Sequence, residues 1–402
     1  MKILFMHRDF PGQFKYIAPV LAQNPQNLVM FITSDDKIPT MPGINKLVYK
    51  IPEIAGSLYL KECETAVLHA QATANIAISM KNKGIKPDII YAHSWGPAMF
   101  MKDIFPDVPL LCYFEWFDNA QGGAVGFDGN LPSIDYRETI RANNAYKLIE
   151  LCACDGGISP TEWQKSQFPK EFQNKIKVIH DGINTDICKP DENAKFLVRD
   201  KNLELTAKDE VITYATRGME PMRGFPQFME AVNTLLKKRP NAHFVIGGND
   251  KVCYGEPLKS GTYKELMLNK FKIDLNRVHF VGGLDYDEYL KLLQISSVHV
   301  YSTYPFILSW SILEAMSVGC CIVASNTAPV VEVMQDNFNG LLFDFYNLEQ
   351  LVEKVEYALD NKDKMKKIRN NARQTVIEKY ELKNLLTKQI EYIINLISNK
   401  SN

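Results

Sequence analysis

Several features are scarce in this 402-residue sequence, and each absence argues against a class of protein. The net charge is only −1, so nothing attracts the whole chain to nucleic acid or to an anionic membrane. No apolar run approaches the about 20 residues that a membrane-spanning helix needs. The first residues, Met1–Met6, pass directly into a strand-like pattern, and we expect no signal peptide. We therefore expect a cytoplasmic protein that has no nucleic-acid partner.

Motifs for metals and for common cofactors are also scarce. The eight cysteines are scattered, and those inside apolar runs, such as Cys112 and Cys320, are typical of reduced, buried thiols. Cys152 and Cys154 form a Cys-x-Cys pair, but no second pair of Cys or His lies at zinc-ligand spacing nearby. We find no G-x-G-x-x-G loop, no Walker loop and no Asp-x-Asp pair at a clear site position. We expect no metal and no resident cofactor.

What the sequence does contain is ordinary globular composition and a regular alternation of elements. A chain of this length, 46% apolar, is too long for one core and fits two domains. Short apolar runs alternate with longer helical patterns, which predicts parallel sheets covered by helices on both faces. The strands expected in the first half are Ile3–Met6, Leu28–Ile32, Ile89–Ala92, Leu110–Phe114, Cys152–Ile158 and Ile176–Ile179. The helices expected there are Gln13–Ala22, Lys61–Lys83 and one opened by a Thr161/Gln164 capping box.

The alternation restarts after a turn-rich segment, His180–Asp186, which we interpret as a linker. We predict a first domain over residues 1–188, a second over 189–378, and a C-terminal helix over 379–402. The amphipathic pattern of Tyr380–Ser398 indicates that this helix docks on the protein. The strands expected in the second half are Val211–Ala215, His243–Ile246, Val278–Val281, Val298–Tyr301, Cys321–Ala324 and Leu341–Phe343. The helices expected are Pro226–Lys237, Asp287–Gln294, Ser309–Ser317, Val330–Met334 and Leu348–Leu359.

Two such sheets in series predict a ligand site at the carboxyl ends of the strands. Gly12 follows the first strand and permits a tight turn whose backbone N–H groups could meet an anion. It could equally be a plain turn residue. Arg217 and Arg223 flank a strand-to-helix turn in the second half, and forked guanidinium donors suit a diphosphate. The alternative is a surface pair neutralised by Glu220.

Glu314 lies in an otherwise apolar helical pattern between Leu313 and Ala315. Because a buried carboxylate without a partner is costly, a polar group must meet it. The hydroxyl groups of a ribose would serve, and a structural hydrogen bond to an amide or a lysine is the alternative. His93 ends a predicted strand, where it could contact a reacting hydroxyl or fill a purely structural place.

The second half resembles the retaining family 4 glycosyltransferases of GT-B fold, in a bacterial branch. The residues that carry the resemblance are Arg217, Arg223-Gly224, Val281-Gly282-Gly283, Leu313–Ser325, Pro329–Val333 and Asn339–Phe343. The segments Phe10–Phe14 and Tyr113–Trp116 are similar to that branch as well. The resemblance covers nearly the whole chain and implies two Rossmann-like domains whose parallel sheets face a central cleft. It also implies that the C-terminal helix returns to the first domain.

The resemblance implies a role for particular residues. Gly12 matches the glycine-rich turn near the donor phosphates, Arg217 matches a phosphate-binding arginine, and Arg223 stands near the usual lysine, one residue further along. Glu314 matches the second acid of an E-x7-E motif, which binds the ribose. The first acid would fall at Phe306 and is absent, so either another group compensates or the donor sugar differs.

Further residues of the donor site follow from the same resemblance. We expect Gly282 and the backbone of Ile307, Leu308 and Ser309 to face the donor. His93, with the two arginines, is expected at the reacting centre. Glu115 and Asp118, which follow a predicted strand, are candidates for the acceptor, with His7 and Arg8 as weaker ones, and the glycine-rich loop Asn119–Asn130 could close over it.

The resulting hypothesis is a metal-independent hexosyltransferase that retains the anomeric configuration. Its partners would be a nucleotide-sugar donor, with UDP as the expected nucleotide, and a glycan or lipid-linked acceptor. A role in polysaccharide biosynthesis would bring brief contact with the inner membrane face, although no strong basic amphipathic anchor is visible. Two alternatives remain open: a GT-B-like epimerase or phosphorylase, and a non-catalytic protein that binds sugar nucleotides.

Overall fold

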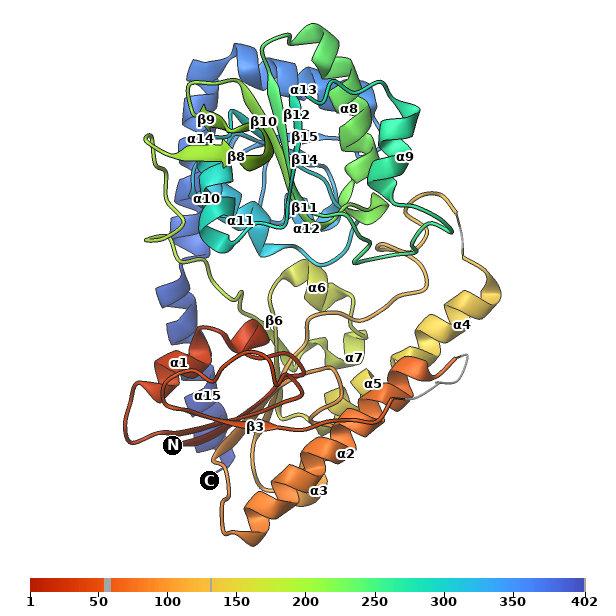
Figure 1. Cartoon of the computed structure of the whole chain (residues 1–402). Coiled ribbons are helices and arrows are strands. Elements are labelled where there is room, and N and C mark those ends of the chain that lie inside the picture. The colour runs from red at the N-terminus through yellow and green to blue at the C-terminus, as the bar shows by residue number, and fades with distance from the viewer. Residues whose placement is uncertain (54–58, 131, 401–402) are drawn as a thin grey trace. The chain divides into compact units, whose positions relative to one another are not determined.

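The computed structural model describes residues 1–53, 59–130 and 132–400 and divides the chain into two compact units. Unit 1 comprises Met1–Gly182 and the segment from Lys383 onward, and unit 2 comprises Ile183–Leu382. Each unit has its own parallel sheet and its own apolar core (Figure 1). The first change of unit therefore lies within the segment that we interpret as a linker, where we had placed the boundary after residue 188. Residues 401 and 402 of the predicted C-terminal helix lie outside the described residues.

In unit 1 the described strands form a seven-stranded sheet in the order β3-β2-β1-β4-β5-β6-β7, with every neighbouring pair parallel. Helices cover both faces of such a sheet, which explains why central strands such as β1 and β4 are buried along almost their whole length. The strands are β1 (Lys2–Met6), β2 (Leu28–Thr33), β3 (Ile44–Val48), β4 (Ile89–His93), β5 (Leu110–Tyr113), β6 (Gly156–Ser159) and β7 (Ile176–Val178).

Unit 1 departs from the sequence prediction at two of the expected elements, and four of its seven described α-helices were not expected at all. The expected strand Cys152–Ile158 is wrong in its first half, because α5 continues through Ala153 and β6 begins only at Gly156. The buried residues of α5 recur at helical spacing, at Tyr146, Lys147, Glu150 and Leu151. The expected helix Gln13–Ala22 divides into a short 3₁₀ turn, η1 (Gly12–Phe14), and α1. The helices are α1 (Ile17–Ala22), α2 (Lys61–Asn82), α3 (Met101–Ile104), α4 (Ile134–Asn143), α5 (Ala145–Ala153), α6 (Glu162–Ser166) and α7 (Lys170–Gln173).

Thr161 begins α6, but only half of the predicted capping box forms. The Thr161 hydroxyl accepts a hydrogen bond from the Gln164 backbone N–H at 3.0 Å. The Gln164 side chain instead donates to the Glu115 carbonyl oxygen at 2.8 Å. Gln164 thus joins α6 to the segment that follows β5.

The C-terminal helix α15 (Leu382–Lys400) packs on unit 1, and it is the blue helix beside the red N-terminal segments in Figure 1. Its amphipathic pattern predicts that it docks, and the family resemblance implies the first domain as the place. Ile393 on its inner face is fully buried. A Cβ atom at Gly156 of β6 would lie 2.4 Å from the Tyr392 hydroxyl, so only glycine lets this part of the strand approach the helix. The Lys177 ammonium group of β7 lies 4.1 Å from the centre of the Tyr392 ring.

Unit 2 has a six-stranded parallel sheet, in the order β12-β11-β10-β13-β14-β15, and a separate antiparallel pair, β8 and β9. The strands are β8 (Lys195–Val198), β9 (Leu203–Thr206), β10 (Val211–Gly218), β11 (His243–Asn249), β12 (Val278–Gly282), β13 (Val298–Tyr301), β14 (Ile322–Ser325) and β15 (Leu341–Phe343). The α-helices are α8 (Phe225–Lys238), α9 (Tyr263–Lys270), α10 (Tyr286–Gln294), α11 (Trp310–Ser317), α12 (Ala328–Val331), α13 (Leu348–Asp360) and α14 (Lys362–Lys379). The expected helix Val330–Met334 therefore begins earlier, at Ala328, and ends at Val331.

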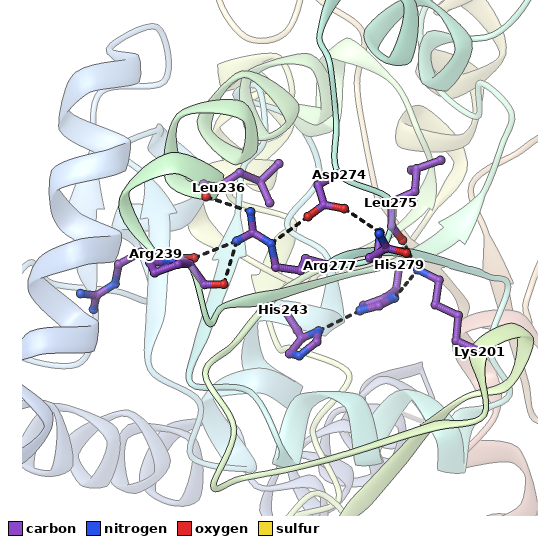
Figure 2. Close-up of polar contacts among 10 residues, drawn as sticks. Lys201, Leu236, Arg239, His243, Asp274, Leu275, Arg277 and His279 are labelled. Atoms are coloured by element: carbon purple, nitrogen blue, oxygen red, sulfur yellow. Dashed lines mark hydrogen bonds and ion pairs between the residues drawn. The ribbon is translucent and has the colours of Figure 1, made fainter.

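The amino ends of β11 and β12 carry a polar cluster, shown in Figure 2. Lys201 donates to His279 Nδ1 at 2.9 Å, and His279 Nε2 lies 3.0 Å from His243 Nδ1. Arg277 binds the Asp274 carboxylate at 3.0 Å and the carbonyl oxygens of Leu236 and Arg239. This cluster joins the edge of the sheet to neighbouring loops, at the strand ends opposite to those that carry the candidate site.

Candidate functional site

The residues that the sequence singles out lie in two groups, one in each unit. In unit 1 the group follows β1, β4 and β5, which are neighbours in the sheet. His7 comes directly after β1, His93 is the last residue of β4, and Glu115 follows β5. Because parallel strands end at the same edge of a sheet, three side chains that are far apart in sequence come together.

Hydrogen bonds connect His7 to Glu115 through Gln13, and His93 lies beside Glu115. The Asp9 backbone N–H donates to His7 Nδ1 at 2.8 Å, so the proton of the neutral ring is on Nε2. That nitrogen lies 2.7 Å from Gln13 Oε1, and Gln13 Nε2 donates to Glu115 Oε1 at 2.8 Å. The other oxygen of Glu115 lies 3.5 Å from His93 Nε2. The directions of the donors therefore fix the orientation of His7, Gln13 and Glu115.

His93 is a neutral imidazole in this setting. Its side chain is fully buried, and burial, followed by the charges of Arg8 and Lys147, lowers its pKa to about 3. Burial, followed by the charge of His93, lowers the pKa of His7 to about 3 as well. Neither nitrogen of His93 has a hydrogen-bond partner among the described residues. A neutral ring with unused polar atoms at a strand end can accept or donate a hydrogen bond to a hydroxyl group.

Gly12 and Asp118 are explained in part by contacts within the protein. Gly12 has a φ of +52°, and a Cβ atom there would lie 2.6 Å from the His7 ring. The turn therefore requires glycine because the backbone approaches His7, whereas we expected an N-terminal turn open to an anion. Asp118 is paired with Lys147 at 2.5 Å. These contacts give Gly12 and Asp118 structural roles, and their roles in binding stay predictions.

In unit 2 the second group lies at the carboxyl ends of β10, β12 and β13. Arg217 is an exposed residue near the end of β10. Arg223 ends the short 3₁₀ turn η3 (Pro221–Arg223) that precedes α8. Its Nη1 donates to the Thr303 hydroxyl at 2.8 Å and to the Ile307 carbonyl oxygen at 3.4 Å. These bonds bring a residue that follows β10 against the loop that follows β13.

Glu220, the group that could have neutralised the two arginines, is fully buried. Its Oε2 accepts the backbone N–H groups of Cys253 and Tyr254, the second at 2.8 Å. Burial raises the pKa of Glu220, while these amides and Arg223 lower it. Glu220 therefore holds the loop that contains Cys253 and Tyr254.

Glu314 lies within α11 and is buried, as expected, and a phenol is one of its partners. The Tyr286 hydroxyl donates to Glu314 Oε1 at 2.9 Å and lies 3.2 Å from Cys188 Sγ. Burial, followed by the charge of Glu314, raises the pKa of Tyr286, and the same two causes raise that of Tyr289. Tyr286 is thus a partner of Glu314 that the sequence does not reveal, and the ribose-binding role of Glu314 stays a prediction.

The predicted backbone site around Ile307–Ser309 is partly used within the unit. The Ser309 N–H donates to the Tyr301 hydroxyl at 3.3 Å, and the Ser309 hydroxyl caps α11 by accepting the Ser311 N–H. Leu308 is buried. Gly282 ends β12 with a φ of +71°, and a Cβ atom there would meet nothing within 4 Å. Gly282 is thus required by backbone conformation.

Several residues of these two groups are not evident from the sequence. Gln13, Thr303, Tyr254 and Tyr286 all contact a predicted site residue. Tyr286 follows a strand and begins a helix, which is a signal that could have been used. Tyr254 lies in an irregular loop, and no periodicity marks it. Among the described residues, no group of three or more His, Cys, Asp or Glu side chains is placed to hold a metal ion.

Family models match both units. A model described as Glycosyl transferase family 4 group matches residues 25–188, and one described as Glycosyl transferases group 1 matches residues 198–375. An uncharacterized glycosyltransferase of Methanocaldococcus jannaschii is 23% identical over 312 residues, which are 76% of this chain and 74% of that protein. The N,N'-diacetylbacillosaminyl-diphospho-undecaprenol alpha-1,3-N-acetylgalactosaminyltransferase of Campylobacter jejuni is 28% identical over 212 residues, about half of each chain (51% and 51%).

Solved structures share the fold over almost the whole chain. Sucrose-phosphate synthase from Thermosynechococcus elongatus aligns with a TM-score of 0.77 at 16% identity and covers 99% of this chain and 100% of that one. HepE of Anabaena, solved in complex with UDP-glucose, aligns with a TM-score of 0.68 at 15% identity and covers 98% and 100%. Among the described residues, no helix is long and apolar enough to span a membrane.

Proposed function

Since this chain belongs to the family 4 glycosyltransferases, which have the GT-B fold, we propose that it transfers a hexose from a nucleoside diphosphate sugar to a hydroxyl acceptor. We propose UDP as the nucleotide, retention of the anomeric configuration, and no metal in the reaction. The observation that carries the proposal is that unit 2 holds Arg223 in the turn after β10 and places the buried acid Glu314 on α11.

The two residues supply different parts of a nucleotide site. A guanidinium group stays charged and offers several N–H donors, so Arg223 suits a diphosphate whose negative charge grows as the sugar leaves. Glu314 accepts a hydrogen bond from Tyr286, and a ribose hydroxyl can donate to the same carboxylate. The complex of HepE with UDP-glucose supports UDP as the nucleotide.

For the chemical step we propose that the leaving diphosphate takes the acceptor proton on the face from which it departs. This scheme needs no protein nucleophile, and the chain would act by positioning and by stabilising charge. We propose that neutral His93 orients a hydroxyl group, because a lowered pKa leaves its ring able to accept a hydrogen bond at pH 7. Glu115 and Asp118 are the proposed acceptor residues.

We propose a glycan or a lipid-linked glycan as acceptor, used in polysaccharide biosynthesis by a bacterial cell. The Campylobacter jejuni relative is named for an undecaprenol-linked substrate, which supports a lipid-linked acceptor. In that case the protein would work in the cytoplasm and contact the inner face of the membrane briefly.

Thermal unfolding with a panel of nucleoside diphosphates and their sugars tests the donor. A ligand that binds only the folded chain raises the melting temperature, and at equal ligand concentration a tighter ligand raises it more. We expect UDP and one UDP-sugar to do so, and uridine to do so less. Product analysis with and without acceptors then separates the alternatives: an epimerase changes the donor without acceptor, and a non-catalytic binder gives no product with any acceptor.

Arg217→Ala tests the proposed charge stabilisation. Because the Arg217 side chain is exposed, we expect no loss of folding, whereas turnover should fall by about 10²–10³ if the guanidinium binds the leaving diphosphate. Arg199→Ala is the matched control, since Arg199 is also exposed and pairs with Glu288 outside the site. Wild-type turnover in Arg217→Ala would remove this residue from the mechanism.

A further inference from the structure

The guanidinium group of Arg223 lies beside two aromatic rings in unit 2. Its Cζ atom is 5.2 Å from the centre of the Tyr254 ring and 5.8 Å from the centre of the Phe306 ring. The two rings meet edge to face, with centres 5.2 Å apart and planes inclined by 61°. Tyr254 comes from the loop between β11 and α9, and Phe306 from the loop between β13 and α11. Two separate loops therefore converge on one side chain.

Hydrogen bonds fix one end of the same guanidinium group. Both bonds, to the Thr303 hydroxyl and to the Ile307 carbonyl oxygen, are donated by Nη1. Among the described residues, the fork of Nε and Nη2 has no protein acceptor. That fork is the part of arginine whose geometry matches two oxygen atoms of a phosphate.

The loop that carries Tyr254 is itself anchored beside Arg223. The buried carboxylate of Glu220, three residues before Arg223, accepts the N–H groups of Cys253 and Tyr254. A Cβ atom at Gly218 would lie 2.6 Å from the Lys251 carbonyl oxygen, so this loop packs against the end of β10. The backbone at Tyr254 is thus held by the same turn that carries Arg223.

We propose that Tyr254 and Phe306 are positioning residues, which hold the Arg223 guanidinium for the diphosphate of the donor without neutralising it. The proposal rests on the proposed function. The face of an aromatic ring attracts a cation but donates and accepts no strong hydrogen bond, so it does not compete with phosphate oxygens. A carboxylate at position 306 would form a forked ion pair with Arg223 and occupy the donors that the phosphate needs.

Holding the side chain in place also lowers the cost of binding. A long arginine side chain that is mobile before binding loses rotamer freedom when it meets its ligand, and a preorganised one has lost it already. Phe306 therefore has a chemical role that differs from that of an acid: it supplies orientation and leaves the charge of Arg223 available.

A thermal-unfolding cycle without ligand tests the contact itself. The variants are Phe306→Leu, Arg223→Met and the double variant of the full chain, and both substitutions keep apolar bulk. If the ring holds the cation, the two single shifts in melting temperature sum to more than the shift of the double variant. Additive shifts would overturn the proposal.

Calorimetric titration with UDP and with uridine tests the role in binding. We expect Phe306→Leu and Tyr254→Leu each to weaken UDP binding about two- to fivefold, the effect of losing a partly exposed cation–π contact, and to leave uridine binding unchanged. Phe306→Tyr and Tyr254→Phe, which keep the rings, should restore the wild-type affinity for UDP. Phe306→Glu should weaken UDP binding more than Phe306→Leu does.

The same titrations in the Arg223→Met background complete the test. There Phe306→Leu should have no further effect on UDP, because the cation that the ring positions is missing. An equal loss for UDP and uridine, or a loss that persists in this background, would overturn the proposal. If the wild-type chain binds no nucleoside diphosphate, the proposed function fails, and the unfolding cycle still decides whether the rings hold Arg223.

Discussion

At the scale of single residues, two glycines of the candidate donor site share a left-handed backbone conformation but have different surroundings. Gly224 follows Arg223 with a φ of +69°, and a Cβ atom there would lie 2.3 Å from Ser302 Cβ. Gly282 has nearly the same φ, +71°, but its Cβ atom would meet nothing within 4 Å. Gly224 is therefore constrained by both conformation and contact, and Gly282 by conformation alone.

Substituting each glycine with alanine separates the cost of backbone strain from the cost of a steric clash. We expect Gly282→Ala to lower the free energy of unfolding by about 1–2 kcal/mol, the cost of a left-handed alanine. Gly224→Ala should cost more than about 3 kcal/mol, because the clash with Ser302 adds to the same strain. Denaturant unfolding of both variants provides the comparison. Equal losses would show that the loop carrying Ser302 yields without cost.

The candidate site shows which residues a sequence can reveal. Arg217, Arg223 and Glu314 are candidates because their charges stand at a strand end or within an apolar helical pattern, and their roles stay predictions. Tyr254 and Tyr286 were missed because their contacts depend on how loops fold back on the sheet. The aromatic contact of Phe306 with Arg223 was likewise unpredictable, since the two lie 83 positions apart in the numbering and meet only in the folded unit.

At the scale of elements, α15 shows how a terminal helix is held to a sheet. Its buried positions include Leu385, Leu386 and Ile393, on the face that packs on unit 1. Ile393 is fully buried, whereas its neighbour Ile394 is 44% exposed. Adjacent residues on a helix point about 100° apart, so Ile393 faces the interior of unit 1 while Ile394 faces away from it.

Alanine substitutions at these adjacent positions test the docking of α15. Ile393→Ala should lower the free energy of unfolding of unit 1 by about 2–5 kcal/mol, through lost burial and the cavity that remains. Ile394→Ala is the matched control and should change it by less than about 0.5 kcal/mol. Chemical denaturation monitored by the tryptophans provides the measurement. A similar effect of both substitutions would contradict the packing of α15 described above.

Most of the strands that the sequence predicts correctly are buried along most of their length. Central strands such as β1, β4 and β14 are continuous apolar runs because both faces are covered, and the sequence reveals them directly. β3 has one buried residue of five, and the β8–β9 pair exposes alternate residues, so neither forms a clear apolar run. The strand expected at Cys152–Ile158 failed because an apolar helix end and a buried strand follow one another without a polar break.

At the scale of the whole molecule, all seven histidines share one property. Burial is the largest cause that lowers the pKa of each one: His7, His69, His93, His180, His243, His279 and His299. The cluster in Figure 2 shows why His279 resists a proton. It accepts from the Lys201 ammonium group through Nδ1, so a protonated His279 would lose that bond and face a second cation. Burial raises the pKa of Glu150 to about 8, so this carboxyl keeps its proton in the folded chain, whereas the histidines resist taking one up.

These shifts predict that stability falls on the acid side of neutrality. Unfolded histidines take up protons near pH 6.5, while those of the folded chain resist down to about pH 4 (His69, His180, His279, His299) or 3 (His7, His93). The unfolded state therefore binds more protons in this window, and the free energy of unfolding must fall as the pH falls.

Glu150 lowers stability as the pH rises from about 4.5 to 8, since only the folded state keeps its proton there. With seven groups against one, we expect a maximum near pH 7 and a steep loss towards pH 5, measured by denaturant unfolding at several pH values. His279→Gln should make the acid limb shallower, and Glu150→Gln should flatten the alkaline limb. A free energy of unfolding that stays constant between pH 7 and 5 would show that these histidines can take up protons in the folded chain.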